Sequence, residues 1–596
     1  MALNITRLHT LFIILLLTFT TTQEASAHDV LLGAEKNSPK RESRAVWITT
    51  LGGLDWPKNS AFTAAGRERQ KNDLCRLLDQ LKEININTVF LQTRVRASVI
   101  YPSKYEPWDI ALTGHWNTDP GYDPLQFAIE ECHKRGMELH AWVVTIPAYK
   151  VSQAKGMGSS GIHVKKPNLV KRVGEQYFMD PSRTETADYL SNICTEIAGR
   201  YDIDGIHFDY IRYPEDAGSF PDADAFKKSG AKNKAQWRRN NITRIVRKIY
   251  KDVKSIKPWI RMSCSPVGKY RDLSRYPSKG WNCYDAVYQD AQGWLKEGIQ
   301  DALYPMMYFK GNHFYPFAAD WQEQENGRPV APGLGIYFMS PSEKNWPLSD
   351  ITNELHYLRT INIGGQAYFR CKFLTDNTKG LYDYLKNTFY AYPALTPAAT
   401  WLDNVPPTPP SNFRTESLPD DMERLCWDAS TDNSDGGVRY NVYVGDESYV
   451  NTSKAENLVA TALQETSYTY NPRWLKANGL RIVVRAMDRF GNESVVEGEK
   501  GQADDDKDFV AGGYFGGPDF SVFSKRYGCI EPEPNGDILL PKRETEMYAI
   551  TDMQGRILKT GFYLRKVNVS KLPSGWYQLR TLDKKGSRRI LEFWKR

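Results

Sequence analysis

The sequence has few cysteines for its length, and their spacing forms neither a disulfide framework nor a metal site. Eight cysteines are scattered between Cys75 and Cys529 of the 596 residues, and no two form a CxxC pair. An HExxH motif and a tight histidine cluster are also lacking. The sequence therefore predicts no metal and no other cofactor, and it predicts that most cysteines are small buried hydrophobes.

Other motifs with well-understood chemistry are missing as well. No glycine-rich phosphate fingerprint follows the first expected strand, which disfavours a Rossmann-type nucleotide site. The segments "GLGIYF" and "CSPVG" lack the GxSxG elbow of serine hydrolases. The net charge is only +7 and no basic stripe is present, so nucleic acid is not an expected partner.

Long apolar runs are scarce beyond the N-terminus. Arg7 precedes an apolar core at 11–19, and a small-x-small site follows at 25–27. This pattern predicts a signal peptide over residues 1–27, with cleavage before His28. The run is too short for a membrane span, and we expect no transmembrane segment elsewhere. The sequence thus predicts an exported protein, located in the periplasm, at the cell surface or outside the cell.

From Arg44 to about Phe373, strand-like runs alternate with helix-like runs. Eight such units predict an α/β protein with a (β/α)8 TIM-type barrel over residues 41–390, and a doubly wound open sheet is the alternative. The expected strands are 44–50, 86–97, 137–145, 204–213, 260–268, 301–309, 328–338 and 364–373. The expected helices include 68–84, 124–136, 184–201 and 239–256. A barrel places its functional site at the C-terminal ends of the strands.

The remaining chain has a different texture. A Pro-rich linker is expected at 391–412, a β-sandwich at 413–500, a Gly/Asp-rich linker at 501–527 and an all-β domain at 528–596. Trp427, "YNVY" (440–443) and "VVRAMDRFGNES" give the sandwich a resemblance to a fibronectin type III module. The last segment resembles the C-terminal sorting domains of proteins exported by the type IX route, through its "DMQGRILKT" turn and "LPSGWY".

The stretch "DGIHFDYIRYP" (204–214) carries the strongest candidate for catalysis. On a barrel strand, alternation points Gly205, His207 and Asp209 inward, with Asp209 at the mouth. Partial burial there raises a carboxyl pKa, as a general acid near neutral pH requires. The alternative for Asp209 is an ion pair with Arg212 or with the arginines of the second strand. Asp204, at the bottom, is interpreted as a structural entry to the strand.

Further polar and aromatic side chains are expected to line the mouth and bind substrate. Arg94 and Arg96 share a face of the second strand with Gln92, where they either contact substrate oxygens or form a buried ion-pair layer. Trp142 is a candidate platform for a sugar ring, and His140 is either functional or a satisfied core residue. The other candidates for substrate binding are His207, Arg212, Tyr213, Tyr308, Gln366 and Arg370.

Blocks in matching order over roughly 41–390 resemble the glycosyl hydrolase-like family 10 of exported bacterial proteins. They include "RAVWITTLGGLDWP" (44–57), "FLQTRVRASVIYPSKYEPW" (90–108), "YDPLQFAIEECHKRGMELHAWV" (122–143), "DGIHFDYIRYP" and "LKEGIQDALYPMMYF" (295–309). The resemblance implies a (β/α)8 fold and glycoside hydrolase activity, with bacterial cell-wall glycans among the substrates. It does not supply a settled catalytic pair.

A more distant comparison is with the family 18 chitinases, whose fourth-strand motif is DGxDxDxE. Asp204 and Asp209 match two acidic positions, whereas His207 replaces an Asp and Ile211 stands in place of the catalytic Glu. Asp209 would therefore need another partner. Glycosidases usually place a second carboxylate about 5–5.5 Å or about 6.5–9.5 Å away, unless an N-acetyl group of the substrate assists. Asp290, beside Tyr288 and Trp294, is the favoured partner, and Glu215 and Asp216 are alternatives.

These observations favour a glycoside hydrolase that acts on a polysaccharide or on peptidoglycan glycan strands. The competing hypothesis is a non-catalytic glycan-binding protein on a hydrolase scaffold, since a fold does not imply an activity. A third class is a surface adhesin whose sandwich modules are the main functional part.

Overall fold

The computed structural model describes residues 38–274, 280–446 and 449–495, and six short segments between 537 and 595. The predicted signal peptide (1–27) and the predicted linker at 501–527 lie outside the described residues. Within the described part, seven cysteines are free thiols, and all but Cys75 are buried. No helix of this part combines the length and apolarity needed to cross a membrane.

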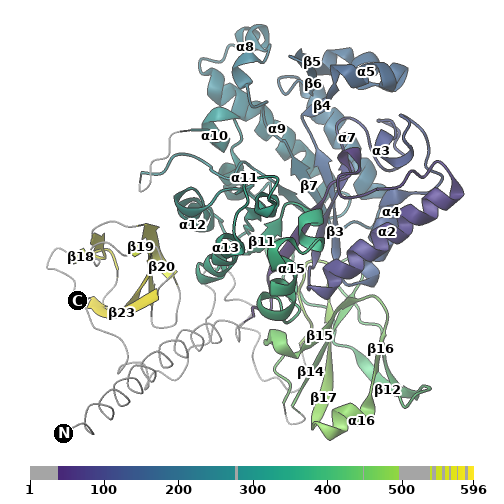
Figure 1. Cartoon of the computed structure of the whole chain (residues 1–596), viewed down its shortest axis with the longest axis vertical. Helices are drawn as coiled ribbons and strands as arrows, with labels where there is room; N and C mark the ends of the chain where they lie inside the picture. Colours follow the sequence, from purple (N-terminus) through teal and green to yellow (C-terminus); the bar gives the residue numbers. More distant parts are fainter. Residues whose placement is uncertain are drawn as a thin grey trace, which may run out of the picture.

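The largest unit is a curled sheet of eight parallel strands in the order β10-β11-β1-β2-β3-β7-β8-β9 (Figure 1). Isolated parallel bridges from Leu303 to Val330 and from Met306 to Gly333 join its two end strands. We call this sheet and its helices the barrel. Its strands are β1 (Ser43–Ile48), β2 (Thr88–Arg94), β3 (Glu138–Val144), β7 (Gly205–Asp209), β8 (Arg261–Cys264), β9 (Ala302–Leu303), β10 (Gly333–Leu334) and β11 (Gly365–Tyr368). The prediction of a parallel α/β architecture is confirmed.

A helix follows each strand and covers the outside of the sheet. These helices are α2 (Ala64–Glu83), α4 (Pro124–Lys134), α7 (Thr184–Arg200), α9 (Lys234–Lys254), α11 (Ala291–Glu297), α12 (Tyr315–Glu323), α13 (Leu348–Thr360) and α14 (Cys371–Thr375). In α2 the apolar spacing buries Leu74, Leu78 and Leu81, and the Thr63 hydroxyl accepts a hydrogen bond from Gly66 N at the start of the helix.

Side-chain alternation divides each strand between an outer and an inner core. On β7, Ile206 and Phe208 join the large outer cluster beneath the helices. The inner face instead carries His207, whose ring stacks on Phe90 with centroids 4.0 Å apart. The predicted facing of β7 is therefore confirmed. The strand ends at Asp209 rather than at 213, because Tyr210 adopts a positive φ of 52° that turns the chain out of the sheet.

The loop after β3 contains an antiparallel sheet that the sequence patterns do not predict. Its strands, in the order β4-β6-β5, are β4 (Pro147–Lys150), β6 (Gln176–Met179) and β5 (Val170–Val173), and α5 (Val151–Met157) follows β4. Figure 1 shows this sheet at the opposite end of the barrel from the sandwich, which comprises residues 411–487. It extends the barrel beyond the C-terminal ends of its strands.

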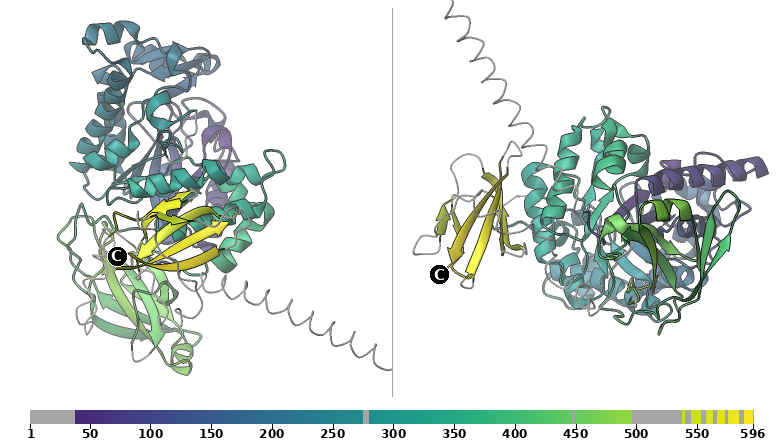
Figure 2. Two further views of the ribbon diagram at one scale, coloured as in Figure 1. Left: turned by 90° about the vertical axis from the view of Figure 1, so that its left-hand side faces the viewer. Right: turned by 90° about the horizontal axis from the view of Figure 1, so that it is seen from below.

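Two three-stranded antiparallel sheets form the sandwich, drawn in green in Figure 2. One sheet contains β12 (Ser411–Ser417), β13 (Glu423–Asp428) and β16 (Ser467–Tyr470), and the other contains β15 (Leu458–Leu463), β14 (Arg439–Asp446) and β17 (Leu480–Met487). Trp427 and Tyr440 lie in the hydrophobic core of the sandwich. Near the C-terminus the described strands form a sheet in the order β20-β19-β22-β23 and a pair β18-β21. They are β18 (Asp537–Leu539), β19 (Thr545–Asp552), β20 (Ile557–Phe562), β21 (Lys566–Asn568), β22 (Gly575–Asp583) and β23 (Arg588–Lys595).

Asp204, one residue before β7, joins the sandwich to the bottom of the barrel. Its Oδ1 accepts hydrogen bonds from Arg439 Nη2 at 2.9 Å and Arg489 Nη2 at 3.1 Å, both from the sandwich. Its Oδ2 contacts His133 Nε2 at 2.8 Å and accepts from Leu139 N at 2.8 Å. Burial opposes the charge of Asp204, but the two arginines and His133 outweigh it and hold the pKa well below its usual range. Asp204 is thus a structural residue, and it fixes two domains rather than only starting a strand.

Candidate active site

Asp209 occupies the C-terminal end of β7 at the mouth of the barrel, where it is 6% exposed. Its Oδ1 accepts hydrogen bonds from Tyr210 N at 2.8 Å and Ser265 Oγ at 3.1 Å. Its Oδ2 accepts a hydrogen bond from Trp142 Nε1 at 3.2 Å, its one hydrogen bond within the described ranges. These three donors fix the carboxyl group from β3, β7 and the end of β8.

Burial raises the pKa of Asp209, while the charge of Arg212 and the hydrogen bonds from Ser265, Tyr210 and Trp142 lower it. Burial is the largest effect, so the net pKa lies above the usual aspartate range. Because Oδ1 already accepts two hydrogen bonds and Oδ2 accepts a single long one, Oδ2 is the oxygen better suited to carry a proton. A carboxyl group of this kind can act as a proton donor.

Tyr210 lies next to Asp209 and is surrounded by four charged groups. Burial and the charges of Asp209 and Glu215 raise the pKa of the phenol, and the charges of Arg212 and Arg96 lower it. The guanidinium of Arg212 stacks over the Tyr210 ring, with Cζ 4.6 Å from the centroid, and its Nη2 donates to Glu215 Oε1 at 3.4 Å. Two cations and two carboxylates therefore meet around one half-exposed ring.

Arg96 differs from the other arginines of the site. Its side chain is half-buried and makes no hydrogen bond or ion pair with any residue in the described part of the chain. It is close enough to lower the pKa of Tyr210. A guanidinium in this position is free to bind the oxygen atoms of a ligand.

Half-exposed aromatic rings form a wall around the mouth. Tyr308 stacks on Phe369 with centroids 5.4 Å apart, and it meets Tyr337 edge-on at 5.7 Å. Burial raises the pKa of the Tyr308 phenol, and the nearby charge of Asp209 raises it further. The Tyr308 ring therefore lies close to the carboxyl group of Asp209. Trp281, 41% exposed, lies 5.1 Å from the Arg212 Cζ. Sequence reasoning missed Trp281, because the only signal for it is its exposure in the folded protein.

Several predicted substrate-binding residues instead hold the scaffold around the mouth. Arg94 is fully buried and forms a bidentate ion pair with Glu106, at 2.8 and 2.7 Å, so it adopts the buried ion-pair alternative. Gln92 Oε1 accepts from Thr50 N and Leu51 N. Arg370 pairs with Asp55 at 2.5 Å. Trp142 is only 4% exposed, so it positions Asp209 and offers no open platform.

The remaining predicted residues lie inside the protein. His207 accepts from Trp47 Nε1 at 3.1 Å and contacts Ser263 Oγ, and burial holds its pKa well below the usual range, so the ring is neutral. His140 contacts Glu138 at 3.0 Å near the start of β3. Gln366 donates to the Tyr390 hydroxyl, and the buried Tyr213 hydroxyl accepts from Asn241. None of these four side chains contacts Asp209.

The structure gives Asp290 a local role. Its carboxylate accepts from Gly293 N at 3.2 Å and caps the N-terminus of α11, and it also accepts from Tyr270 Oη at 2.6 Å. It shares no contact with Asp209. By comparison, Glu215 is linked to the Asp209 environment through Arg212 and Tyr210. Asp216 contacts Ser219 in the same loop. Within the described ranges, no three His, Cys, Asp or Glu side chains cluster as they would around a metal ion.

Comparison with known proteins identifies the family. The model of the family described as glycosyl hydrolase-like 10 matches residues 42–337. The chain is 33% identical to glycosyl hydrolase YngK of Bacillus subtilis over 396 residues, which cover 62% of this chain and 76% of that protein. The chain belongs to the glycosyl hydrolase-like 10 family. The chain is also 31% identical to glycosyl hydrolase DigH of Escherichia coli over 368 residues, which cover 56% of this chain and 83% of that protein.

The family match begins at the start of β1 and extends past β10, so it includes the end of β7 with Asp209 and the loop with Trp281. Among solved structures, the glycoside hydrolase domain of PgaB from Bordetella bronchiseptica aligns with 58% of this chain and 98% of its own, at 15% identity and a TM-score of 0.40. The sandwich and the C-terminal sheets lie beyond the family match.

Proposed function

We propose that this protein is an exported glycoside hydrolase that cleaves O-glycosidic bonds in a polysaccharide, with the glycan strands of bacterial cell walls as its substrate. The observation that carries the proposal is the setting of Asp209, a buried carboxyl group with a raised pKa at the mouth of a barrel from a glycosyl hydrolase-like family. The half-exposed aromatic wall and the unpaired Arg96 suit a long polar chain with ring faces.

In this mechanism Asp209 donates the proton on Oδ2 to the glycosidic oxygen as the bond to the anomeric carbon breaks. The bonding electrons leave with that oxygen, and positive charge develops on the sugar ring. Glu215, through its carboxylate, either removes a proton from the attacking water or bonds to the anomeric carbon first. Water supplies the hydroxyl group of the new reducing end. The proton that water loses, taken directly by Asp209 or passed to it from Glu215 through solvent, replaces the one that Asp209 gave to the glycosidic oxygen, and Glu215 is again a carboxylate.

The test is the release of reducing ends by the mature protein from purified peptidoglycan glycan strands and from a panel of polysaccharides. Cleavage of at least one of them is expected. A protein that binds a glycan and never releases reducing ends would support the competing function, a non-catalytic glycan-binding protein. Two observations favour this alternative. The side chain of Glu215 is 68% exposed, and no second carboxyl group among the described residues contacts Asp209 directly.

We assign two roles to the domains beyond the barrel: they extend the protein toward its substrate, and they attach it to a surface. The sandwich, which we propose to be of the fibronectin type III kind, is fixed to the bottom of the barrel through Asp204, at the end opposite Asp209. It therefore leaves the mouth open to a polymer. We assign the C-terminal sheets to export or surface retention, in line with the predicted signal peptide.

Replacing Glu215 with glutamine should lower kcat about a hundredfold or more, because the second carboxylate is lost while the side-chain shape is kept. The matched variant is Asp290→Asn, which keeps the cap of α11, because Asn caps a helix about as well as Asp does, and leaves the glycan-cleaving step intact. Both are measured by release of reducing ends at saturating glycan. The opposite ranking, with Asp290→Asn the more damaging for kcat, would assign the second carboxylate to Asp290.

Replacing Ser265 with alanine should move the alkaline limit of activity to higher pH. The Ser265 hydrogen bond lowers the pKa of Asp209, so its loss raises that pKa further. A proton donor works only below its pKa, and the fall of kcat/KM on the alkaline side therefore shifts upward. The pH profile of kcat/KM for both proteins measures the shift. A shift to lower pH would contradict the role of Asp209 as the acid.

A further inference from the structure

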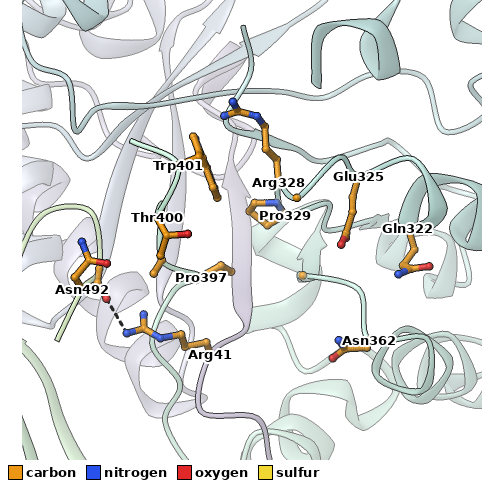
Figure 3. A pocket seen from close by; sticks show the side chains of 14 residues that line it. Arg41, Gln322, Glu325, Arg328, Pro329, Asn362, Pro397, Thr400, Trp401 and Asn492 are labelled. Atoms are coloured by element: carbon orange, nitrogen blue, oxygen red, sulfur yellow. Dashed lines mark hydrogen bonds between the residues drawn. The ribbon is translucent and has the colours of Figure 1, made fainter. Parts of the chain in front are cut away.

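A cavity lies at the other end of the barrel, away from Asp209. It has a volume of about 80 Å³ and lies where the end of α12 and its following loop meet the turn after α13, the segment 397–401 and the sandwich loop at 491–492. Figure 3 shows Trp401 and Thr400 on one side of it and Arg328, Glu325 and Asn362 on the other. Gly327 lines the rim and is exposed, so a ligand can enter from solvent and need not fit wholly inside.

The walls of this cavity are fixed by buried contacts. Trp401 Nε1 and Arg328 Nη1 both donate to Asp301 Oδ1, at 3.1 and 3.3 Å, and the Arg328 guanidinium packs over the Trp401 ring at 4.9 Å. Arg41 donates to Gly491 O at 2.7 Å and to Thr396 O at 3.0 Å. The segment between barrel and sandwich is therefore held in place on both sides, and the cavity is formed in advance of any ligand.

Three polar side chains that line the cavity differ from those that fix its walls. Gln322, Glu325 and Asn362 are half-buried, and their side chains make no hydrogen bond or ion pair within the described segments. Burial alone raises the pKa of Glu325 to about 7, since no neighbouring cation holds its charge. Partly buried polar groups without partners cost free energy, and a ligand that bonds to them recovers it.

The charges around the cavity select the class of ligand. Arg41 and Arg328 disfavour a cationic ligand, and the unpaired carboxyl group of Glu325 disfavours an anionic one. Two amides and a carboxyl group beside an indole ring suit a neutral molecule with several hydroxyl groups. We propose that this cavity is a binding site for a neutral sugar unit, separate from the active site and independent of the proposed catalysis.

The experiment measures binding of monosaccharides to the full mature chain by saturation-transfer NMR titration. The probes are glucose and N-acetylglucosamine as neutral sugars, and glucuronate and glucosamine as their charged counterparts. Wild type should bind at least one neutral sugar saturably and more tightly than either charged sugar. The double variant Gln322→Ala/Glu325→Ala should weaken that binding by at least about tenfold, because two hydrogen-bonding side chains are lost.

Three further variants complete the design. Gln324→Ala removes an exposed side chain of the same loop that does not line the cavity, so it should bind as wild type does. Asn362→Gly suits the positive φ of 52° at this position and should also weaken binding, which provides a second cavity variant if the double variant fails to fold. Trp281→Ala alters the barrel mouth and should leave binding unchanged. Absence of saturable binding by wild type, preference for a charged sugar, full binding by the cavity variants, or loss of binding in Trp281→Ala would each overturn the proposal.

Discussion

The Asp209→Asn protein is expected to cleave glycan about 10²–10⁴-fold more slowly than wild type, while it still binds the glycan. The amide keeps the shape of the carboxyl group and can accept the hydrogen bonds from Ser265 and Tyr210. It has no proton to give to the glycosidic oxygen. The measurement pairs initial rates of reducing-end release with equilibrium binding of the same glycan, so that a catalytic loss is separated from a binding loss.

The matched control for Asp209→Asn is Glu354→Gln on α13. Glu354 is fully buried, and its two carboxyl oxygens have no hydrogen-bond partner in the part of the chain that the structure describes. Burial raises its pKa well above the usual range, so it is a neutral acid in the folded protein. Its amide variant tests whether the loss of any buried carboxyl group harms the enzyme. If Glu354→Gln loses as much activity as Asp209→Asn, or if Asp209→Asn retains full activity, Asp209 is not the proton donor.

The parallel architecture was predictable because most strands carry apolar residues on the face that meets the helices, and the longer helices have a regular apolar face. The three short strands β4, β5 and β6 were missed for the opposite reason. Each has four residues. The side chains of β5 and β6 are mainly half-exposed, and β4 is a short buried run that ends at an exposed lysine, so none of the three carries the apolar signal of a longer strand. Such strands are stabilised by pairing with each other, which a one-dimensional pattern does not reveal.

The candidate site was predictable in part. Strand alternation identified Asp209 and its inward direction, since the period of a strand is two residues. The same alternation could not decide what Arg94 does, because its partner Glu106 lies in a loop twelve residues later and meets it only in the fold. Arg96, two positions further along, is left unpaired and near Tyr210. Two arginines with the same pattern therefore have different roles, and the difference depends on one loop carboxylate.

The two aspartates of "DGIHFDYIRYP" show how position sets the chemistry of one residue type. Both are buried. Asp204 meets two guanidinium groups, which hold its pKa well below the usual range, so it is an anion. Asp209 meets neutral donors and one arginine that does not form an ion pair with it, so burial dominates and the pKa rises. Asp204 therefore holds the barrel and the sandwich together, and Asp209 is available for proton transfer.

The Asp204→Asn protein should unfold with a free energy about 3–5 kcal/mol lower than that of wild type at neutral pH. The substitution removes the negative charge between Arg439 and Arg489, so the buried Arg439 loses its counter-charge and Arg489 keeps only the exposed Asp202. Denaturant unfolding of the full chain, followed by tryptophan fluorescence, measures the change. The matched control is Asp202→Asn, whose side chain is 51% exposed and pairs with the same Arg489 at 2.7 Å. This exposed pair is expected to contribute less than about 1 kcal/mol.

The difference between wild type and Asp204→Asn should also depend on pH in one direction. The folded-state pKa of Asp204 lies below that of the unfolded chain, near 3.9 for a free aspartate, so its stabilising effect is complete above that value. As the pH falls below about 4 and through the folded-state pKa, the carboxylate of wild type gains a proton and the effect is lost. The two unfolding free energies should therefore converge in acid and stay apart at neutral pH. A constant difference across this range, or equal effects of Asp202→Asn and Asp204→Asn, would show that the buried carboxylate does not couple the barrel to the sandwich.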